Sequence, residues 1–268
     1  HRCRTAPPGT NSRGSSASRS PAATLGHKRS INAITVSQHV TNADHRAEEV
    51  IYNELSRARP GYGFVMEERG VVEGTDKTNR FIVDPLDGTL NFMHGIPHFA
   101  VSIALEREGE LYAGVVYNVI SGDIYWAERG QGAWLENWRL KVATRIKLAN
   151  AVVATGTPFV GHSPERHQLF WAELSHLTQE TSGIRRFGSA ALDLAYVAAG
   201  RFDGFWERNL NAWDIAAGIV LVREAGGVVQ EIDGGELLKT GNILAANASL
   251  SPKILSRLKA AKKRIEDE

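Results

Sequence analysis

The chain has 268 residues, 43% of them hydrophobic and 23% charged, which fits a folded globular protein and excludes a wholly disordered one. No stretch reaches the roughly 18 apolar residues that a membrane-spanning helix needs. The single cysteine, Cys3, excludes a disulfide framework and a cysteine-rich zinc site, and it predicts a reducing, cytoplasmic location. The net charge of +1 hides a basic start, because residues 1–43 contain no Asp or Glu; the rest is mildly acidic, which suits a cation-binding enzyme better than a nucleic-acid platform.

The first residues differ in character from the rest of the chain. Residues 1–36 are rich in Ser, Arg, Pro, Ala and Gly and show no periodicity, so we expect a poorly ordered basic segment there. Such a start also resembles an organelle transit peptide, although the amphipathic period of one is missing. From Asp44 onward apolar residues recur at helical spacing, which predicts a helix over 43–58 that ends before Pro60.

We expect one domain over 37–268, of α+β class and made of two unlike halves. The first half, 37–150, carries strand-like runs punctuated by turn residues, which predicts an antiparallel meander with strands at 81–83, 100–105, 112–117 and 124–127. The second half, 151–268, alternates helices with short strands and is predicted to be mixed α/β. Its predicted helices cover about 164–181, 189–199, 212–225 and 251–266, and its strands lie near 151–154, 203–206, 227–232 and 242–246.

Two carboxylates follow the first strong strand signal. Asp84 and Asp87 stand three residues apart at the exit of the apolar run 81–83, so both side chains can face one centre. Carboxylates with a backbone carbonyl between them are typical ligands for Mg²⁺ rather than zinc. Gly88 permits a close approach of the backbone, and free amides at the start of a short helix from Thr89 would suit a phosphate oxygen. The alternative is a turn in which both Asp side chains merely cap backbone amides.

Further acidic residues occupy similar positions elsewhere. Glu67 and Glu68 follow the apolar run 64–66, where a solvated charge pair is the alternative to a functional role. Asp214 lies at the start of an apolar helix, where it would also complement the helix dipole without any chemical role.

Taken together and in this order, these segments resemble the inositol monophosphatase family, and more closely its bacterial extragenic-suppressor branch. The matching segments are 40–44, 67–68, 81–92, 95–103, 188–193 and 213–218. The resemblance implies a layered α-β-α-β-α fold like that of fructose-1,6-bisphosphatase. It also implies a lithium-sensitive, Mg²⁺-dependent phosphatase that hydrolyses inositol monophosphate or a similar polyol phosphate with a metal-activated water.

The same resemblance implies roles for individual residues. One metal would be held by Glu67, Asp84 and the carbonyl of Leu86, a second by Asp84, Asp87 and Asp214, and a third, weaker ion would lie near Glu67. Glu67 and Thr89 would act on the attacking water, and Asp44 would accept a hydrogen bond from Thr89. The amides of Gly88 and Thr89 would hold the phosphate. The polyol would contact Glu207, Gly188, Ser189 and Ala190, while Arg185 or Arg186 would attract the anion or simply be solvated.

Other functions stay open at this point. Within the phosphatase class, the alternative substrates to inositol monophosphate are fructose-1,6-bisphosphate, histidinol phosphate, a nucleotide 3′-phosphate and NADP. A regulatory module that binds RNA or a transcription complex through residues 1–43 or the basic run 253–264 is a further alternative, with solvated charge as the plainer explanation. The family resemblance also implies a homodimer, for which Trp134 and Trp138 are candidate interface residues.

Overall fold

The computed structural model describes residues 33–267, with side chains from Asn42 onward, and its first element is helix α1, Ala33–Ala58. The predicted end of this helix is confirmed, but its predicted start is wrong by ten residues. Val36, Val40 and Ala43 continue the helical spacing of the later apolar residues, which accounts for the earlier start. Of the segment 1–36 that was expected to be poorly ordered, residues 1–32 lie outside the described part of the chain, and 33–36 belong to α1.

An eight-stranded sheet forms the first half, with strand order β2-β1-β3-β4-β5-β6-β7-β8. Its strands are β1 Gly63–Met66, β2 Gly70–Val72, β3 Asn79–Asp87, β4 Ala100–Arg107, β5 Glu110–Asn118, β6 Ile124–Glu128, β7 Gly132–Leu135 and β8 Trp138–Arg139. The meander from β3 to β8 is antiparallel, as the sequence predicts. Only β1 joins it in parallel, alongside β3, and this pairing brings the ends of two sequence-distant strands to one edge.

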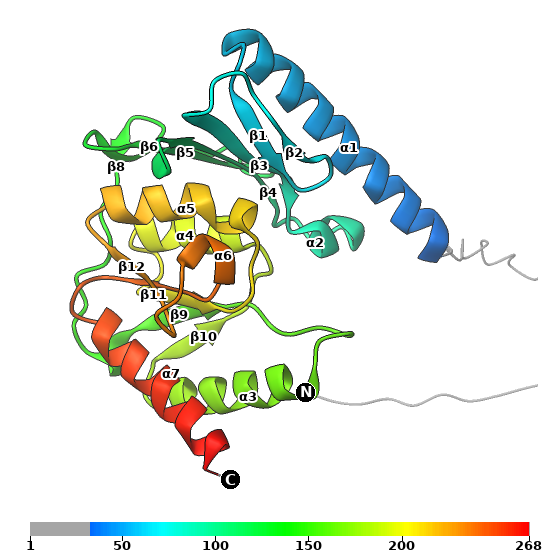
Figure 1. Ribbon diagram of the computed structural model, residues 1–268. Helices are drawn as coiled ribbons and strands as arrows, with labels where there is room; N and C mark the ends of the chain where they lie inside the picture. The colour runs from blue at the N-terminus through cyan, green and yellow to red at the C-terminus, as the bar shows by residue number, and fades with distance from the viewer. Residues whose placement is uncertain (1–32, 268) are drawn as a thin grey trace, which may run out of the picture. The chain divides into compact units, whose positions relative to one another are not determined.

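Two helices form the layer between the sheets: α4, Ala190–Ala198, and α5, Ala212–Glu224. Nearly every residue of α4 is buried, so this helix lacks the polar face of a surface helix. The two helices pack closely, because a Cβ at Gly218 would lie 2.5 Å from the Leu194 side chain. In Figure 1 both helices run beneath the first sheet and above the second.

A five-stranded sheet forms the second half, with strand order β10-β9-β11-β13-β12. Its strands are β9 Val152–Thr155, β10 Gly183–Arg185, β11 Gly204–Glu207, β12 Val228–Glu231 and β13 Ile243–Ala246. Strand β9 pairs in parallel with β10 and β11, whereas β13 is antiparallel to β11 and β12. The predicted mixed character of this half is therefore confirmed.

Helices α3, Pro164–Thr178, and α7, Ser251–Glu266, cover the outer face of the second sheet (Figure 1). Ser163 caps α3 and Pro164 is its first residue, as the sequence predicts. Short helices are α2 Thr89–Met93, α6 Leu237–Thr240 and the 3₁₀ turn Leu148–Asn150. With α1 beside the first sheet, the layers read helix, sheet, helix, sheet, helix, so the predicted layered fold is confirmed. None of the helices within 33–267 is long and apolar enough to cross a membrane.

Candidate active site

Four carboxylates from three elements lie together at one edge of the first sheet. Met66 pairs with Val83 in the parallel register of β1 and β3, so Glu67, the first residue after β1, lies beside Asp84, which is still within β3. Asp84 hydrogen-bonds with Glu67 and also with Asp214, from the first turn of α5. Asp87, at the end of β3, adds a fourth negative group that repels Asp84. We call Glu67, Asp84, Asp87 and Asp214 the acid cluster.

The backbone around the two aspartates of β3 is irregular. The pairing between β3 and β4 shifts register between Asp84 and Asp87, and the Leu86 amide donates to Asp84 Oδ1 at 2.8 Å. Gly88 follows with φ 98°, in the left-handed region that favours glycine. A Cβ there would lie 3.1 Å from the carbonyl oxygen of His98 and 3.2 Å from that of Gly188, so only glycine fits this turn easily.

Asp87 and Asp214 also stabilise the starts of the two central helices. Asp87 Oδ2 accepts from the Ser189 hydroxyl at 2.5 Å and from the Ala191 amide at 2.8 Å, at the start of α4. Asp214 Oδ2 accepts from the Asn211 amide at 2.7 Å, at the start of α5. The capping role considered as an alternative is thus present, and it holds both carboxylates in place beside Asp84.

The acid cluster resists ionisation. Burial, together with the charges of neighbouring carboxylates, raises the pKa of Glu67 to about 7 and that of Asp214 to about 7. Burial also raises the pKa of Asp87 to about 6, although the hydrogen bonds from Ser189 and from the start of α4 oppose it. Asp84, which is 2% exposed, has its pKa raised well above the usual range by burial and then by the other three acids.

The donor set of the acid cluster fits a hard divalent cation. Every donor is an oxygen, and no Lys or Arg within 33–267 forms an ion pair with a member of the cluster. Among the described residues no group of three or more His, Cys, Asp or Glu is already positioned to hold a metal ion. A cation would therefore have to displace the protons that the raised pKa values favour and draw the side chains together.

A cavity of about 800 Å³ opens beside the acid cluster. The predicted phosphate and polyol contacts Gly88, Thr89, Gly188, Ser189, Ala190 and Glu207 all line it, together with Glu67, Asp87 and Asp214. Glu207, at the end of β11, approaches the backbone of Gly156 so closely that a Cβ on that glycine would overlap its carboxylate. The Gly156 amide donates to Glu207, yet burial and the charges of Asp214 and Asp87 raise the pKa of Glu207 to about 8.

One predicted contact is not formed. The Thr89 hydroxyl donates to the carbonyl oxygen of Leu86 at 3.1 Å, and not to Asp44. Asp44 is 5% exposed and its buried Oδ1 has no partner among the described residues. Burial and then the charge of Glu68 raise the pKa of Asp44 to about 6. The hydrogen bond expected between Thr89 and Asp44 is therefore not formed in this structure, where the Leu86 carbonyl accepts the hydroxyl proton.

Three residues in or next to the cavity were given no role by the sequence or had their role left open: Arg186 and Asp193 line it, and Asn91 contacts Gly188, which lines it. The Asn91 side-chain amide donates to the carbonyl oxygens of His98 at 2.8 Å and Phe187 at 2.7 Å, and so ties α2 to the loop before α4. Arg186 lines the cavity and donates to Thr157. Asp193 lines it from α4. Asn91 and Asp193 belong to the motif segments, which was the only available signal.

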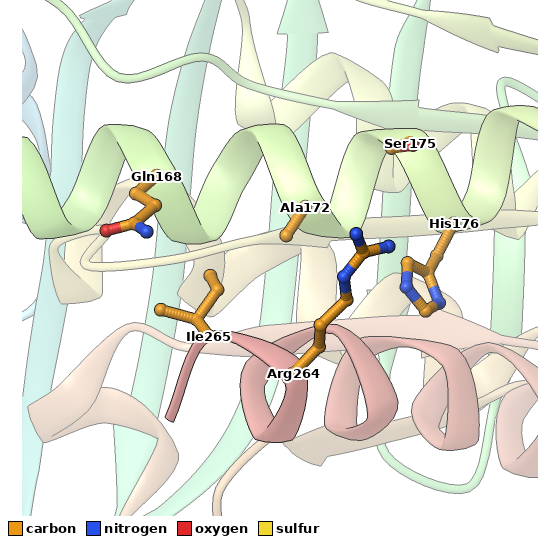
Figure 2. Close-up of a pocket in the computed structure, with 6 residues that line it drawn as sticks. All are labelled: Gln168, Ala172, Ser175, His176, Arg264 and Ile265. Atoms are coloured by element: carbon orange, nitrogen blue, oxygen red, sulfur yellow. The ribbon is translucent and has the colours of Figure 1, made fainter. Parts of the chain in front are cut away.

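A second, smaller pocket of about 220 Å³ lies between α3 and α7. Figure 2 shows its lining, with Gln168, Ala172, Ser175 and His176 on α3 and Arg264 and Ile265 on α7. None of these six residues is acidic, and the pocket lies in the outer helix layer, away from the strand ends that carry the acid cluster. We therefore place the candidate active site in the larger cavity.

Known proteins of one family are similar to this chain. The family model of the inositol monophosphatase family matches residues 20–263. An inositol-1-monophosphatase of Caulobacter vibrioides is 57% identical over 83% of this chain and 88% of its own length. The Nus factor SuhB of Escherichia coli is 44% identical over 82% of each chain. The crystal structure of the extragenic suppressor protein suhB from Bartonella henselae matches with a TM-score of 0.78 and 52% identity, over 83% of this chain and 90% of that one. The chain therefore belongs to the inositol monophosphatase family.

Proposed function

We propose that this protein is an inositol-phosphate phosphatase, a phosphoric monoester hydrolase that depends on Mg²⁺ and acts on inositol monophosphate or a similar polyol phosphate. The observation that carries the proposal is the acid cluster: four carboxylates without a basic partner in 33–267, beside the Gly88 turn and a cavity of about 800 Å³. Its relatives of 53–57% identity are named inositol-1-monophosphatase, which supports the same activity here.

The residues that would hold metal are those expected from the family. Glu67, Asp84 and the Leu86 carbonyl would bind one Mg²⁺, and Asp84, Asp87 and Asp214 a second, with a third ion near Glu67. Metal at such a site offsets the charge of the phosphate and makes water a stronger nucleophile. Asp84 suits a bridging role because it already hydrogen-bonds with acids on two sides.

The other residues would bind the phosphate and the polyol and orient the attacking water. Gly88 and Thr89 would donate backbone amides to the phosphate, where the left-handed turn at Gly88 keeps side-chain atoms away. Thr89 and Glu67 line the cavity, where each would orient the attacking water. Thr89 would donate to Asp44 once it no longer donates to the Leu86 carbonyl, and Oδ1 of Asp44 has no partner among the described residues. Glu207, Gly188, Ser189 and Ala190 would contact the polyol.

The test is phosphate release from inositol 1-phosphate by the full chain after removal of metal with EDTA. We expect turnover only after Mg²⁺ is added, inhibition by millimolar lithium, and loss of at least about a hundred-fold in Asp214→Asn. Asp123→Asn, in the turn between β5 and β6, is the matched control and should keep wild-type turnover. Full turnover in EDTA, or in Asp214→Asn, would contradict the proposal.

The substrate is proposed as a class, and a panel would define it. Fructose-1,6-bisphosphate, histidinol phosphate, a nucleotide 3′-phosphate and NADP should be assayed beside inositol 1-phosphate under the same conditions. We expect the highest kcat/KM for the inositol ester. A ten-fold or larger preference for any of the others would reassign the substrate and leave the metal-dependent hydrolysis in place.

A second candidate function is binding to RNA or a transcription complex, because relatives at 41–44% identity are named Nus factor SuhB. Residues 1–32 of the basic start lie outside the described residues. On α7, Lys253 donates to the Ile146 carbonyl, Arg257 pairs with Glu180 and Lys262 with Asp233, so much of its charge is engaged within the fold. Salt-dependent RNA binding that is lost on deletion of 1–36 would favour this function, and no binding at low salt would exclude it.

A homodimer and a cytoplasmic location stay predictions. Trp138 is 78% exposed on β8, and Trp134 of β7 stacks on Trp126 at 5.8 Å between ring centroids, so aromatic surface is available at this edge of the sheet. We expect light scattering to give twice the chain mass, and Trp138→Ser to shift it toward the monomer. A monomeric mass for the wild-type chain would contradict the dimer.

A further inference from the structure

Asp193 is a buried acid for which the fold supplies no partner. It lies in the first turn of α4 and is 1% exposed, and its Oδ1 has no hydrogen-bond partner among the described residues. The same side chain lines the large cavity. A buried carboxylate is normally paired or hydrogen-bonded, so an unpartnered one that faces a cavity indicates a partner that binds from the cavity.

The helix does not need Asp193 as a cap. The start of α4 is already satisfied, because Ser189 Oγ accepts from the Leu192 amide at 3.4 Å and Asp87 Oδ2 accepts from the Ala191 amide at 2.8 Å. Asp203 shows how this protein treats a structural acid nearby: it is equally buried, and it accepts from Arg145 at 2.6 Å and from the Val152 amide at 2.9 Å. Asp193 has no such contacts.

The groups around Asp193 indicate what would bind. Glu207 from β11 and Asp87 from β3 repel it, and Arg186, which lines the same cavity, attracts it. Burial, and then the charge of Glu207, raise the pKa of Asp193 well above its usual range. The positive charge of Arg186 disfavours a further cation between Asp193 and Glu207. Hydroxyl groups suit this place, because each can both donate to and accept from a carboxyl group.

We propose that Asp193, together with Glu207, binds hydroxyl groups of the polyol half of the substrate and so selects polyol phosphates over other phosphate esters. This inference rests on the proposed phosphatase function. It assigns to α4 a substrate contact beyond those at Gly188, Ser189 and Ala190. Buried polar groups designed for a hydroxyl reject analogues that lack it, because the groups are then left unpaired.

The test compares two substrates in Asp193→Asn and Asp193→Ala. We expect KM for inositol 1-phosphate to rise at least about ten-fold in Asp193→Ala and less in Asp193→Asn, which keeps an oxygen acceptor. With p-nitrophenyl phosphate, which has no aliphatic hydroxyl group, kcat/KM should stay within about three-fold of wild type in both variants. Equal loss with both substrates, or no loss with either, would overturn the inference.

Asp203→Asn is the matched control for a structural role. It should lower the melting temperature, since the Arg145 ion pair is lost, and change both substrates alike. Asp193→Asn removes no hydrogen bond and should melt at or above the wild-type temperature; a clear drop would assign Asp193 a structural role instead. If the wild-type protein hydrolyses both esters but the Asp193 variants lose no more activity on inositol 1-phosphate than on p-nitrophenyl phosphate, this inference alone is wrong. A wild-type chain that hydrolyses neither ester contradicts the proposed function as well.

Discussion

The buried acids of this protein form two groups: those that pair with an arginine and those, near the cavity, that do not. Eight Asp or Glu side chains within the described residues are buried, and half of them form an ion pair with an arginine. The paired acids are Glu48 with Arg69, Glu106 with Arg80, Glu173 with Arg208 and Asp203 with Arg145. The four that have no arginine partner in 33–267 are Asp44, Asp84, Asp87 and Asp193. Asp87 and Asp193 line the same cavity as Gly88, Asp84 lies in the strand that leads to Gly88, and Asp44 lies close enough to Glu67 to raise its pKa.

Within the described residues, arginine forms an ion pair with the buried acids of the first group only, although Arg186 lines the cavity and attracts Asp193 without forming an ion pair with it. A buried acid without a counter-charge is costly, and acids with raised pKa values gather where a ligand or a reaction needs them. The arginine-paired acids therefore stabilise the fold, whereas burial of the other four without a counter-charge has a cost in stability that a bound cation or substrate would offset.

The largest effect is expected from Asp84→Asn. Asp84 is the only acid that hydrogen-bonds with two other members of the acid cluster, so its loss should reduce phosphate release at least about a thousand-fold. The same change relieves repulsion and should raise the melting temperature of the metal-free protein. Glu106→Gln, at a partnered acid on β4, should retain turnover. Equal activities of these two variants would remove the distinction between the two groups.

Arg145→Met turns a partnered acid into an unpartnered one. Asp203 would keep only the Val152 amide as a donor, and we expect a loss of about 2 kcal/mol in the free energy of unfolding, since Arg145 is half exposed. Lys239→Met, in the exposed pair with Glu236, is the control and should cost less than about 0.5 kcal/mol. Urea denaturation measures both, and identical midpoints would show that Asp203 does not need its arginine.

Glu48→Gln tests whether an acid that pairs with arginine also positions a member of the acid cluster. Glu48 of α1 is partnered with Arg69, and its Oε2 accepts from the Glu68 amide at 2.9 Å, directly after Glu67. We expect looser placement of Glu67, and hence an increase of about ten-fold in the Mg²⁺ concentration for half-maximal activity, with little change in maximal turnover. Glu54→Gln, in an exposed pair on the same helix, should leave both quantities unchanged.

The smallest effect is a pH dependence of stability. Five acids around the cavity have folded-state pKa values raised to between about 6 and 8, namely Asp44, Asp87, Glu67, Asp214 and Glu207. The folded chain therefore holds more protons than the unfolded chain across this range, and stability falls as pH rises through it. Metal-free protein should melt a few degrees higher at pH 5.5 than at pH 8, and saturating Mg²⁺ should remove this difference. A melting temperature that rises with pH without metal would contradict the account.

Local sequence signals were sufficient for much of the fold and of the site. Strand-like runs punctuated by turn residues predict the meander, and Ser163 followed by Pro164 predicts a helix start that the structure confirms. Asp84-Pro85-Leu86-Asp87-Gly88 after an apolar strand indicates a functional turn because the chain must bend there and Gly88 adopts a left-handed conformation. These features depend on neighbours within a few residues, and a sequence carries that information directly.

Features set by distant contacts could not be predicted in this way. Strand β10 has three residues and exists because it lies parallel to β9, and β8 has only two residues. The bonds from Ser189 and Ala191 to Asp87 join residues more than 100 positions apart, so the capping of α4 by β3 has no local signal. The choice of the Thr89 hydroxyl between Asp44 and Leu86 likewise depends on side-chain geometry alone.

Calorimetric titration of the metal-free protein with Mg²⁺ tests the central claim most directly, because it does not depend on knowing the substrate. If the acid cluster holds the ions, binding at pH 6.5 should release protons, seen as a heat that changes with the ionisation enthalpy of the buffer, and Asp84→Asn should abolish most of it. Unchanged binding in Asp84→Asn, or no Mg²⁺ binding by the wild-type chain, would contradict the account.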